Sequence, residues 1–509
     1  MERQTMSSNS SNLRLNSENL GKLPDEVKVP LYDRGELRQH TVHIGVGGFH
    51  RAHQAVYLDD LLAHKGNERW GECGIGVMSS DDRMRDVLEG QDFLYTVVER
   101  SASEQSARVI GSLVDYVYVP ESREKAIERM AASETRIVSL TITEGGYFID
   151  EGTGDFLAGH PDIQYDLQHP TEPITSMGLI AEALRRRRER GLPPFTIMSC
   201  DNLQGNGHIV QKVLLELTGL GNPALQQWIA ENVAFPNSMV DRITPVTAPA
   251  DIAFVAERFR LDDAWPVVTE PFRQWVIEDT FCNGRPQWEK VGAQLVTDVA
   301  PYEIMKMRLL NGSHLAMAYL GALHGFTYVH EIMQDPLFVT FIQEFMEEVT
   351  PVVPNIPGVS VAEYKASLIE RFSNPTINDQ VTRICSEGSA KIPKWLLPSI
   401  SELLEQRGPV HLLSLVVASW ILYLGRGLDE RGRPLNIIDA RCHELTALAK
   451  RAATDPRPML AVQSIFGEKL PSYEKFVKSV ESSLRMLARS GVDATVSNYL
   501  SSSFLPGTR

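Results

Sequence analysis

The segment from residue 42 to residue 66 constrains the fold more than any other part of the chain. A short apolar run ends at Ile44, a glycine-rich turn occupies residues 45–50, and the following residues carry apolar side chains at helical spacing, at Val56, Tyr57, Leu61 and Leu62. This pattern predicts a strand, a tight turn and a helix. Short apolar runs at residues 74–78, 136–143 and 194–200, separated by helical patterns, repeat the alternation. The first part of the chain therefore predicts an α/β fold whose mostly parallel sheet is covered by helices.

The pattern changes near residue 300. Long helical patterns dominate from there, at residues 301–325, 335–349, 360–372, 411–425 and 472–491, and strand signals nearly vanish. A chain of 509 residues is too long for one ordinary core. We therefore expect a Rossmann-type dinucleotide-binding domain at residues 1–298, with a polar tail at 1–25, and a mostly α-helical domain at 299–509.

Charge and cysteine content exclude several classes of function. A formal net charge of −15 argues against a nucleic-acid partner, and the basic run Arg185–Arg188 with Arg190 predicts the solvated last turn of a helix. There is no apolar run of about 18 residues and no apolar core of a signal peptide near the N-terminus. The five cysteines have no C-x-x-C spacing, which predicts no structural metal site, no disulfide framework and a reducing, cytoplasmic location.

The glycine-rich turn is a candidate site for a dinucleotide. Small residues between a strand and a helix let the backbone approach a pyrophosphate and donate amides to it. His50 takes the place of the third glycine, so the usual G-x-G-x-x-G pattern fails, and a plain tight turn would also use glycines. The position between strand and helix favours binding. The candidate cofactor-binding residues here are Ile44, Gly45, Val46, Gly47, Gly48, Phe49 and His50.

Polar residues after three of the predicted strands are further candidates. Asp81 or Asp82 could accept hydrogen bonds from the adenosine ribose and repel a 2′-phosphate, which predicts NAD as cofactor. The alternative is that Ser80 or Asp81 only caps the next helix. Glu144 and Asn202 also follow strands, where ligands bind in open sheets, although turn chemistry alone could account for both.

Three residues near the start of the helical domain form a candidate chemical site. At about 100° per residue of an α-helix, Lys306, Asn311 and His314 lie within an arc of about 140°. Alcohol oxidation needs a base and donors for the developing alkoxide. Lys306 could be that base if burial lowers its pKa from the reference value of about 10.4. The amides of Asn202 and Asn311 are neutral donors, and His314 could orient a hydroxyl.

The same residues also permit a structural interpretation. Lys306 could extend its amine to solvent, Asn311 could bond its own helix, and His314 could be a core histidine. Tyr302 and Lys306 also form Y-x-x-x-K, the spacing of tyrosine-based short-chain dehydrogenases. Those enzymes carry the pair inside the nucleotide domain, so its place at the start of a helical domain argues against that mechanism.

Five ordered motifs resemble one known family. They are G-x-G-G-F-H-R-A-H at residues 45–53, T-E-G-G-Y at 143–147, S-C-D-N-L-x-x-N-G at 199–207, F-P-N-S-M-V-D-R-I-T-P at 235–245 and K-x-x-x-x-N-x-x-H at 306–314. Together they resemble the polyol-specific long-chain dehydrogenase (mannitol dehydrogenase) family over almost the whole chain. The resemblance implies a Rossmann-type domain followed by a mostly helical one. It also implies metal-independent, NAD-dependent interconversion of D-mannitol and D-fructose by a monomer.

The resemblance also implies roles for individual residues. It implies that Lys306 is the general base and that the amides of Asn202 and Asn311 bind the oxyanion. These roles agree with those that the chemistry of the side chains suggests. Lys394 competes with Lys391 for one role, because the segment SAKIPKWLL holds both. The remaining roles that the resemblance implies are contact with the polyol by His314, Asp241, Arg383 and Lys391, and a proton gate at Glu303.

Three other functions remain open at this point. A fructuronate or tagaturonate reductase would share the lysine and asparagines but would pair a substrate carboxylate with a cation such as Arg383 or Lys391. An arabinitol dehydrogenase would use the same residues. A silent nucleotide-binding protein would share only the fold, and would have no need to keep Lys306, Asn202, Asn311 and His314 together.

Overall fold

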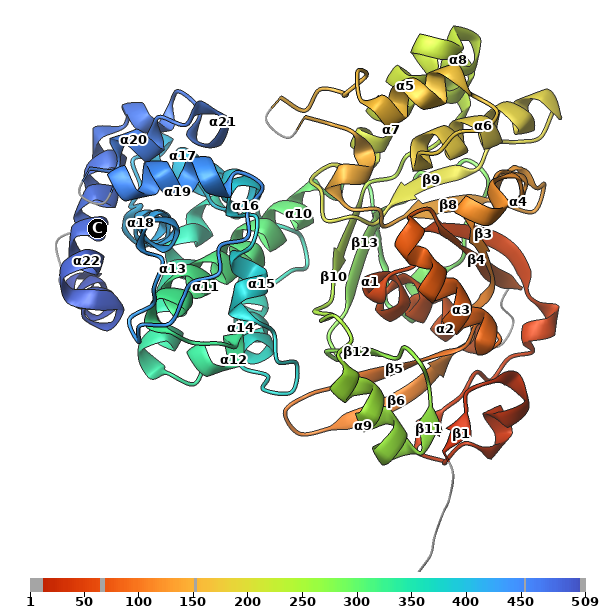
Figure 1. Cartoon of the computed structure of the whole chain (residues 1–509), viewed down its shortest axis with the longest axis horizontal. Helices are drawn as coiled ribbons and strands as arrows, with labels where there is room; N and C mark the ends of the chain where they lie inside the picture. Colours follow the sequence, from red (N-terminus) through yellow and green to blue (C-terminus); the bar gives the residue numbers. More distant parts are fainter. Residues whose placement is uncertain (1–11, 65–68, 151–152, 453–454, 504–509) are drawn as a thin grey trace, which may run out of the picture. The chain divides into compact units, whose positions relative to one another are not determined.

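The computed structural model describes residues 12–64, 69–150, 153–452 and 455–503. The chain forms two compact units, Met1–Val299 and Ala300–Arg509 (Figure 1). No helix among these residues is long and apolar enough to cross a membrane.

A five-stranded parallel sheet is the centre of the first unit. Its order is β7-β4-β3-β8-β9, with β3 at Arg38–Ile44, β4 at Trp70–Gly76, β7 at Leu113–Tyr118, β8 at Ile137–Leu140 and β9 at Thr196–Ser199. The chain runs outward from β3 through β4 to β7, then returns to the other side of β3 for β8 and β9. This reversal is the feature of a doubly wound sheet that creates a ligand crevice at the carboxyl ends of the strands. The predicted Rossmann-type fold is confirmed.

Helices cover both faces of this sheet (Figure 1). One face packs on α2 and α3, through Val56 and Leu88, and the other on α4, α6 and α7, through Ile127, Ile180 and Val210. The helices of the first unit are α1 at Gly48–Ala52, α2 at Gln54–Ala63, α3 at Asp82–Gly90, α4 at Val119–Ala131, α5 at Pro161–Gln168, α6 at Ser176–Glu189, α7 at Asn206–Gly221, α8 at Pro223–Asn232 and α9 at Pro249–Phe259.

Smaller sheets complete the first unit. Their orders are β12-β5-β6-β2, β10-β13-β14 and β1-β11. The strands are β1 at Leu13–Arg14, β2 at Val27–Lys28, β5 at Tyr95–Arg100, β6 at Gln105–Ile110, β10 at Ser238–Asp241, β11 at Leu261–Asp262, β12 at Val267–Thr269, β13 at Gln274–Glu278 and β14 at Gln294–Val296.

The segment predicted as a polar tail is partly integrated into the fold. Residues 1–11 lie outside the described residues, but β1 pairs in parallel with β11. Leu15 is fully buried in a cluster with Phe259 and Leu261. Burial of this one leucine, together with the β1–β11 hydrogen bonds, explains why a largely polar segment is ordered here.

The second unit is helical, and the described part of it contains no named strand. One large apolar cluster joins its helices, with Leu315, Phe341 and Trp420 fully buried. Its helices are α10 at Ala300–Lys306, α11 at Gly312–His324, α12 at Val329–Ile332, α13 at Pro336–Val349, α14 at Val361–Phe372, α15 at Val381–Cys385, α16 at Gly388–Trp395, α17 at Leu397–Glu405, α18 at His411–Arg426, α19 at Cys442–Arg451, α20 at Arg457–Leu460, α21 at Gln463–Phe466 and α22 at Glu474–Ser503. The predicted helical domain is confirmed.

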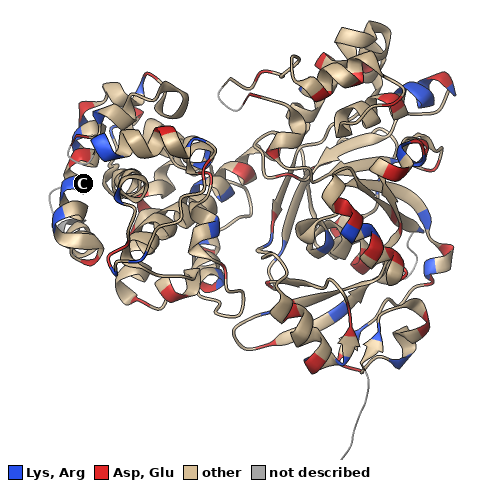
Figure 2. Cartoon of the chain, in the orientation of Figure 1, with Lys and Arg blue, Asp and Glu red and all other residues tan. Residues whose placement is uncertain are grey.

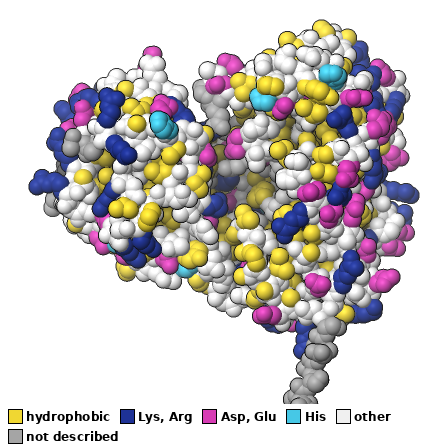
Figure 3. Space-filling view, in the orientation of Figure 1, with side chains coloured by type: hydrophobic (Ala, Val, Ile, Leu, Met, Phe, Trp, Pro, Cys, Tyr) yellow, Lys and Arg dark blue, Asp and Glu magenta, His cyan; other side chains and the backbone are white. Residues whose placement is uncertain are grey.

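The arginine run ends a helix as predicted, but it is not simply solvated. Arg186 forms ion pairs with Glu124 and Glu128 of α4. In Figure 2, acidic and basic positions lie close together on the ribbons of α4 and α6. Arg187 is fully buried and donates to the carbonyls of Ala132 and Thr135. The run therefore binds α6 to its neighbours. On the face seen in Figure 3, basic side chains are interspersed with acidic ones.

Candidate active site

The glycine turn lies between β3 and α1. Gly45 has φ +94°, and a Cβ there would lie 2.1 Å from the carbonyl oxygen of Thr141, so only glycine fits. At Gly47 and Gly48 the nearest atoms to an added Cβ are 3.9 Å away. The backbone is thus open on the side of these two glycines, as close approach of a pyrophosphate requires. The predicted helix is interrupted at His53, whose backbone is not helical.

Asp81, after β4, directly precedes α3, but its side chain makes no capping bond to that helix. The Oδ2 atom of Asp81 accepts a hydrogen bond of 2.9 Å from the backbone N–H of Met78. Asp82 is exposed and begins α3. The bond to Met78 leaves room for ribose binding, because a carboxylate has two oxygens and several acceptor sites.

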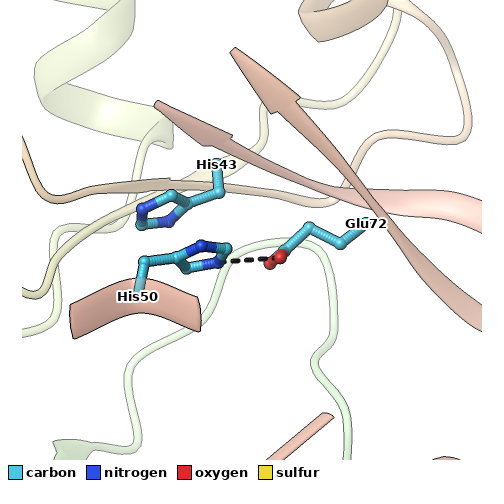
Figure 4. A group of neighbouring side chains, drawn as sticks. All are labelled: His43, His50 and Glu72. Atoms are coloured by element: carbon cyan, nitrogen blue, oxygen red, sulfur yellow. Dashed lines mark ion pairs between the residues drawn. The ribbon is translucent and has the colours of Figure 1, made fainter. Parts of the chain in front are cut away.

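His50 belongs to a fully buried cluster with His43 of β3 and Glu72 of β4 (Figure 4). Its Nε2 atom lies 2.8 Å from Oε1 of Glu72, an ion-pair distance, and its ring stacks on that of His43 with 3.6 Å between centroids. His43 in turn lies 2.8 Å from the hydroxyls of both Ser139 and Thr141. The histidine that breaks the glycine pattern therefore joins the turn to β3, β4 and β8 beneath it.

The geometry of this cluster does not suit a metal ion, although two histidines and a carboxylate are a common ligand set. The planes of the two imidazole rings differ by only 11°. Nitrogen lone pairs lie in the ring planes, so stacked rings cannot direct two of them to one point. Both ring nitrogens of His43 also already have hydroxyl partners.

Replacing Glu72 by Gln is expected to change how stability depends on pH. Burial raises the pKa of Glu72 to about 7, so between about pH 4.5 and 7 the unfolded chain releases a proton that the folded chain keeps. The free energy of unfolding of the parent therefore falls as pH rises through this window. Glutamine does not titrate, so Glu72→Gln removes that loss. We expect the free energy of unfolding of the variant, relative to that of the parent, to rise by about 1–3 kcal/mol as the pH goes from 4.5 to 8.

Urea denaturation at several pH values measures this effect. Burial lowers the pKa of His50 to about 3, but His50 is present in both proteins, so its titration largely cancels in the difference. Glu189→Gln, a change at an exposed residue of α6, is the control. A stability difference between Glu72→Gln and the parent that stays constant from pH 4.5 to 8 would contradict the interpretation.

The loops after β8 and β9 carry Glu144 and Asn202, both exposed at the carboxyl edge of the sheet. Asp201, the residue before Asn202, connects the two loops, and the sequence did not single it out. Its carboxylate accepts bonds from the backbone N–H groups of Ile142 and Thr143, each 2.9 Å long. Its place inside the motif S-C-D-N-L was the signal that could have identified it. Asp241, at the end of β10, is only 4% exposed.

Lys306, Asn311 and His314 lie on one continuous helix and are all buried. Residues Met307–Asn311 form a π-helical turn, in which the N–H of Gly312 donates to the carbonyl of Met307. A π turn holds one more residue than an α turn, which reduces the Lys306–Asn311 angle from about 140° to about 40°. His314 then lies about 20° on the other side of Lys306. The turn thus narrows the predicted 140° arc to about 60°.

Side-chain contacts fix the groups around this helix. The Nδ2 atom of Asn311 donates to Sδ of Met307 at 3.0 Å, and the ring of His314 lies 4.9 Å from that of Phe372. Glu303 is 4% exposed, one turn before Lys306.

Arg383 and Lys391 lie close together in the second unit. Arg383 of α15 binds Asp379 through two bonds of 2.7 Å. The amine of Lys391, on α16, donates to the carbonyl of Ile384 at 3.1 Å and lies 3.3 Å from that of Arg383. Lys394 is exposed. Of the two lysines that compete for one role, Lys391 is therefore the one beside Arg383.

Comparison with known proteins identifies the family. Residues 39–290 match the mannitol dehydrogenase Rossmann domain, and residues 298–488 match the mannitol dehydrogenase C-terminal domain. The chain belongs to the mannitol dehydrogenase family. Mannitol 2-dehydrogenase of Aspergillus fumigatus is 48% identical over 499 residues, which cover 96% of this chain and 99% of the relative. The corresponding protein of Pyricularia oryzae is 46% identical over 480 residues, 93% of this chain and 95% of the relative.

Two solved structures of similar proteins share the fold. The ternary complex of Pseudomonas fluorescens mannitol 2-dehydrogenase with NAD and D-mannitol has 47% sequence identity and a TM-score of 0.89, and the match covers 96% of this chain and 100% of that one. A substrate-free D-sorbitol dehydrogenase has 34% identity and a TM-score of 0.86, covering 95% of this chain and 100% of that one. The two similar proteins thus differ in the polyol that their names give.

Proposed function

We propose that this protein is an NAD-dependent polyol dehydrogenase that interconverts D-mannitol and D-fructose without a metal ion. The observation that carries the proposal is the full-length similarity, 47–48% identity, to proteins named mannitol 2-dehydrogenase. The buried set of Lys306, Asn311 and His314 on one helix supports it, because a protein that only bound a nucleotide would have no need for these groups.

The glycine turn fits a dinucleotide. The backbone is open at Gly47 and Gly48, where an added Cβ would fill the space next to the amides. Asp81, after β4, would bind the adenosine ribose and disfavour a 2′-phosphate, which supports NAD over NADP. NAD supplies the hydride acceptor of the reaction. Ile44, Val46, Phe49, His50 and Glu144 complete the proposed cofactor site.

Lys306 is the proposed general base. It is 7% exposed, and removal from water disfavours an ammonium ion relative to a neutral amine. The neutral amine can accept the proton of the substrate hydroxyl as the alkoxide forms. Glu303, one helical turn earlier and also buried, is the proposed gate through which that proton exchanges with water.

The two asparagines are the proposed donors for the alkoxide. An amide N–H stabilises a developing negative charge without bringing a charge of its own. Asn311 is held by Met307, and Asn202 follows a strand whose end is fixed by its neighbour Asp201. His314, Asp241, Arg383 and Lys391 are the proposed contacts for the hydroxyls of the polyol.

The cation that a fructuronate or tagaturonate reductase would need is partly neutralised here. Arg383 is already bound through two bonds by the carboxylate of Asp379. A second carboxylate would compete with Asp379 for the same guanidinium. This favours a neutral polyol, so mannitol ranks before the uronates, and arabinitol is the proposed secondary substrate.

A spectrophotometric panel tests the proposal. The purified protein is assayed with mannitol, arabinitol, glucitol and fructuronate, each with NAD(H) and NADP(H), and each with and without a chelator. We expect mannitol with NAD to give the highest kcat/KM and the chelator to leave it unchanged. A preference for fructuronate would overturn the substrate assignment, and loss of mannitol oxidation on chelation would overturn the metal-free mechanism.

We also propose a cytoplasmic location and a monomeric state. The five cysteines are free thiols, which supports a reducing compartment. The monomer is proposed from the family resemblance, and sedimentation velocity at several protein concentrations tests it.

A further inference from the structure

The backbone of Thr143 has an unusual conformation for a residue with a side chain. Its φ and ψ angles are 61° and 171°, in a region that is essentially restricted to glycine. Such a residue is strained, and it stays in this conformation only when its surroundings hold it there. It lies three residues after the end of β8, in the loop that carries Glu144.

Asp201 holds this loop. Its Oδ2 and Oδ1 atoms accept bonds of 2.9 Å from the consecutive N–H groups of Ile142 and Thr143. The hydroxyl of Tyr147, at the far end of the loop, donates to Oδ2 at 2.5 Å. One carboxylate therefore binds both ends of a five-residue segment, and bonds to a charged acceptor are stronger than neutral ones.

Asp201 is itself held at its own strand end. Its N–H donates to the hydroxyl of Ser199 at 3.2 Å, and the same hydroxyl lies 2.7 Å from that of Tyr147. The carbonyl of Asp201 accepts a bond of 3.0 Å from the amide of Asn206, the first residue of α7. The residue directly after it is Asn202, so the same contacts also fix the backbone that carries the proposed oxyanion donor.

The loop lies beside the glycine turn. Strand β8 pairs with β3, with Leu140 opposite Ile44, and the hydroxyl of Thr141 donates to the carbonyl of Gly45 at 2.7 Å. If the adenosine half of the dinucleotide lies on the β4 side, where Asp81 is, the β8 side is left for the nicotinamide half. Thr143, Glu144 and Gly145 are exposed, and nothing lies within 4 Å of a Cβ added at Gly145.

We propose that Asp201 is a positioning residue that holds the strained Thr143–Tyr147 loop in place for the nicotinamide half of the cofactor and, at the same time, fixes Asn202. The proposal rests on the proposed function, because it takes the ligand to be a nicotinamide dinucleotide. A change at Asp201 therefore affects both cofactor placement and the donor to the alkoxide.

The chain offers a matched control for this role in Asp166. That carboxylate, which is buried where Asp201 is half-buried, also accepts three bonds, from the N–H groups of Ile174 and Thr175 and from the hydroxyl of Thr175. It lies in α5, its partners precede α6, and it lines a pocket with Leu217 and Gly221 of the last turn of α7, to which the loops after β8 and β9 contribute no residue. Asp166→Asn and Asp201→Asn each put an amide group in place of a carboxylate oxygen that faces backbone N–H donors, so both variants lose stability for the same reason.

Steady-state kinetics and NADH fluorescence titration test the proposal. We expect Asp201→Asn to lower kcat about 30- to 100-fold, because small displacements of reacting groups cost rate steeply. We expect it to raise the Kd of NADH roughly three- to tenfold. Tyr147→Phe removes one of the three donors and should show a smaller loss of kcat. Asp166→Asn should stay within about twofold of the parent in both quantities, at a similar loss of thermal stability.

The outcomes separate this inference from the proposed function. If the parent oxidises a polyol but Asp201→Asn behaves like Asp166→Asn, the positioning role is wrong while the function stands. If the parent oxidises no polyol of the panel, the proposed function fails, and the Kd of NADH still tests the loop. An unchanged Kd for NADH together with an unchanged kcat in Asp201→Asn would overturn the inference.

Discussion

Lys306→Ala is expected to lower the turnover of mannitol by about 10³-fold, because a positioned general base contributes rate factors of this size. The change removes the amine that would accept the hydroxyl proton, and alanine is compatible with the helix that carries it. NADH affinity should stay near that of the parent, since the proposed cofactor residues all belong to the first unit. Stopped-flow turnover and NADH fluorescence titration measure the two quantities.

Two controls make this test specific. Lys365→Ala removes another lysine of the second unit, one that pairs with Glu347 at 2.6 Å, and should leave kcat unchanged. A small primary amine such as methylamine, added to Lys306→Ala, should restore part of the activity by taking the place of the missing base. Turnover of Lys306→Ala close to that of the parent at neutral and alkaline pH would refute Lys306 as base.

Local patterns were sufficient to predict the main elements. The strand, glycine turn and helix at residues 42–64 were visible because apolar spacing and glycine placement are local properties. The same holds for the long helices after residue 300. The break at His53 was not visible, since it depends on contacts that close only in the folded chain, such as the 2.8 Å bond from its ring to the carbonyl of Gln274.

The features of the site that sequence reasoning missed depend on tertiary contacts. The π turn before Asn311 has an ordinary helical sequence, MRLLN, and Arg308 anchors it from outside through Glu402 and the carbonyl of Val352. The strain at Thr143 depends on Asp201, which is 58 positions away in the sequence. Neither partner can be identified from local spacing alone.

Burial of single polar residues was equally unpredictable. Arg187 lies in a run of four arginines that a helical pattern places at a solvated end, yet it is fully buried. Its environment is built from carbonyls at the ends of other elements, those of Pro193, Ala132 and Thr135. The burial of His50 was unpredictable for the same reason, because its partners Glu72 and His43 come from two strands that lie beside it only in the folded chain (Figure 4).

Replacements of the turn glycines are expected to separate a structural role from a cofactor role. Gly45→Ala places a Cβ 2.1 Å from a backbone oxygen at a φ of +94°. We expect it to lower Tm by roughly 5 °C or more and to abolish NADH binding. Gly47→Ala meets no atom closer than 3.9 Å, so Tm should stay unchanged. The Kd for NADH should nevertheless rise about tenfold or more, because the methyl group occupies the path of the pyrophosphate.

The Gly47 variant decides between the two interpretations of the turn. A plain tight turn would tolerate a methyl group in open space, and NADH affinity would then equal that of the parent. Gly159→Ala, where nothing lies within 4 Å of the added carbon, controls for unspecific effects and should alter neither quantity. Weaker NADH binding in Gly47→Ala at unchanged Tm can arise only if the cofactor approaches the added carbon. An NADH affinity equal to that of the parent would mean that the turn is not part of the cofactor site.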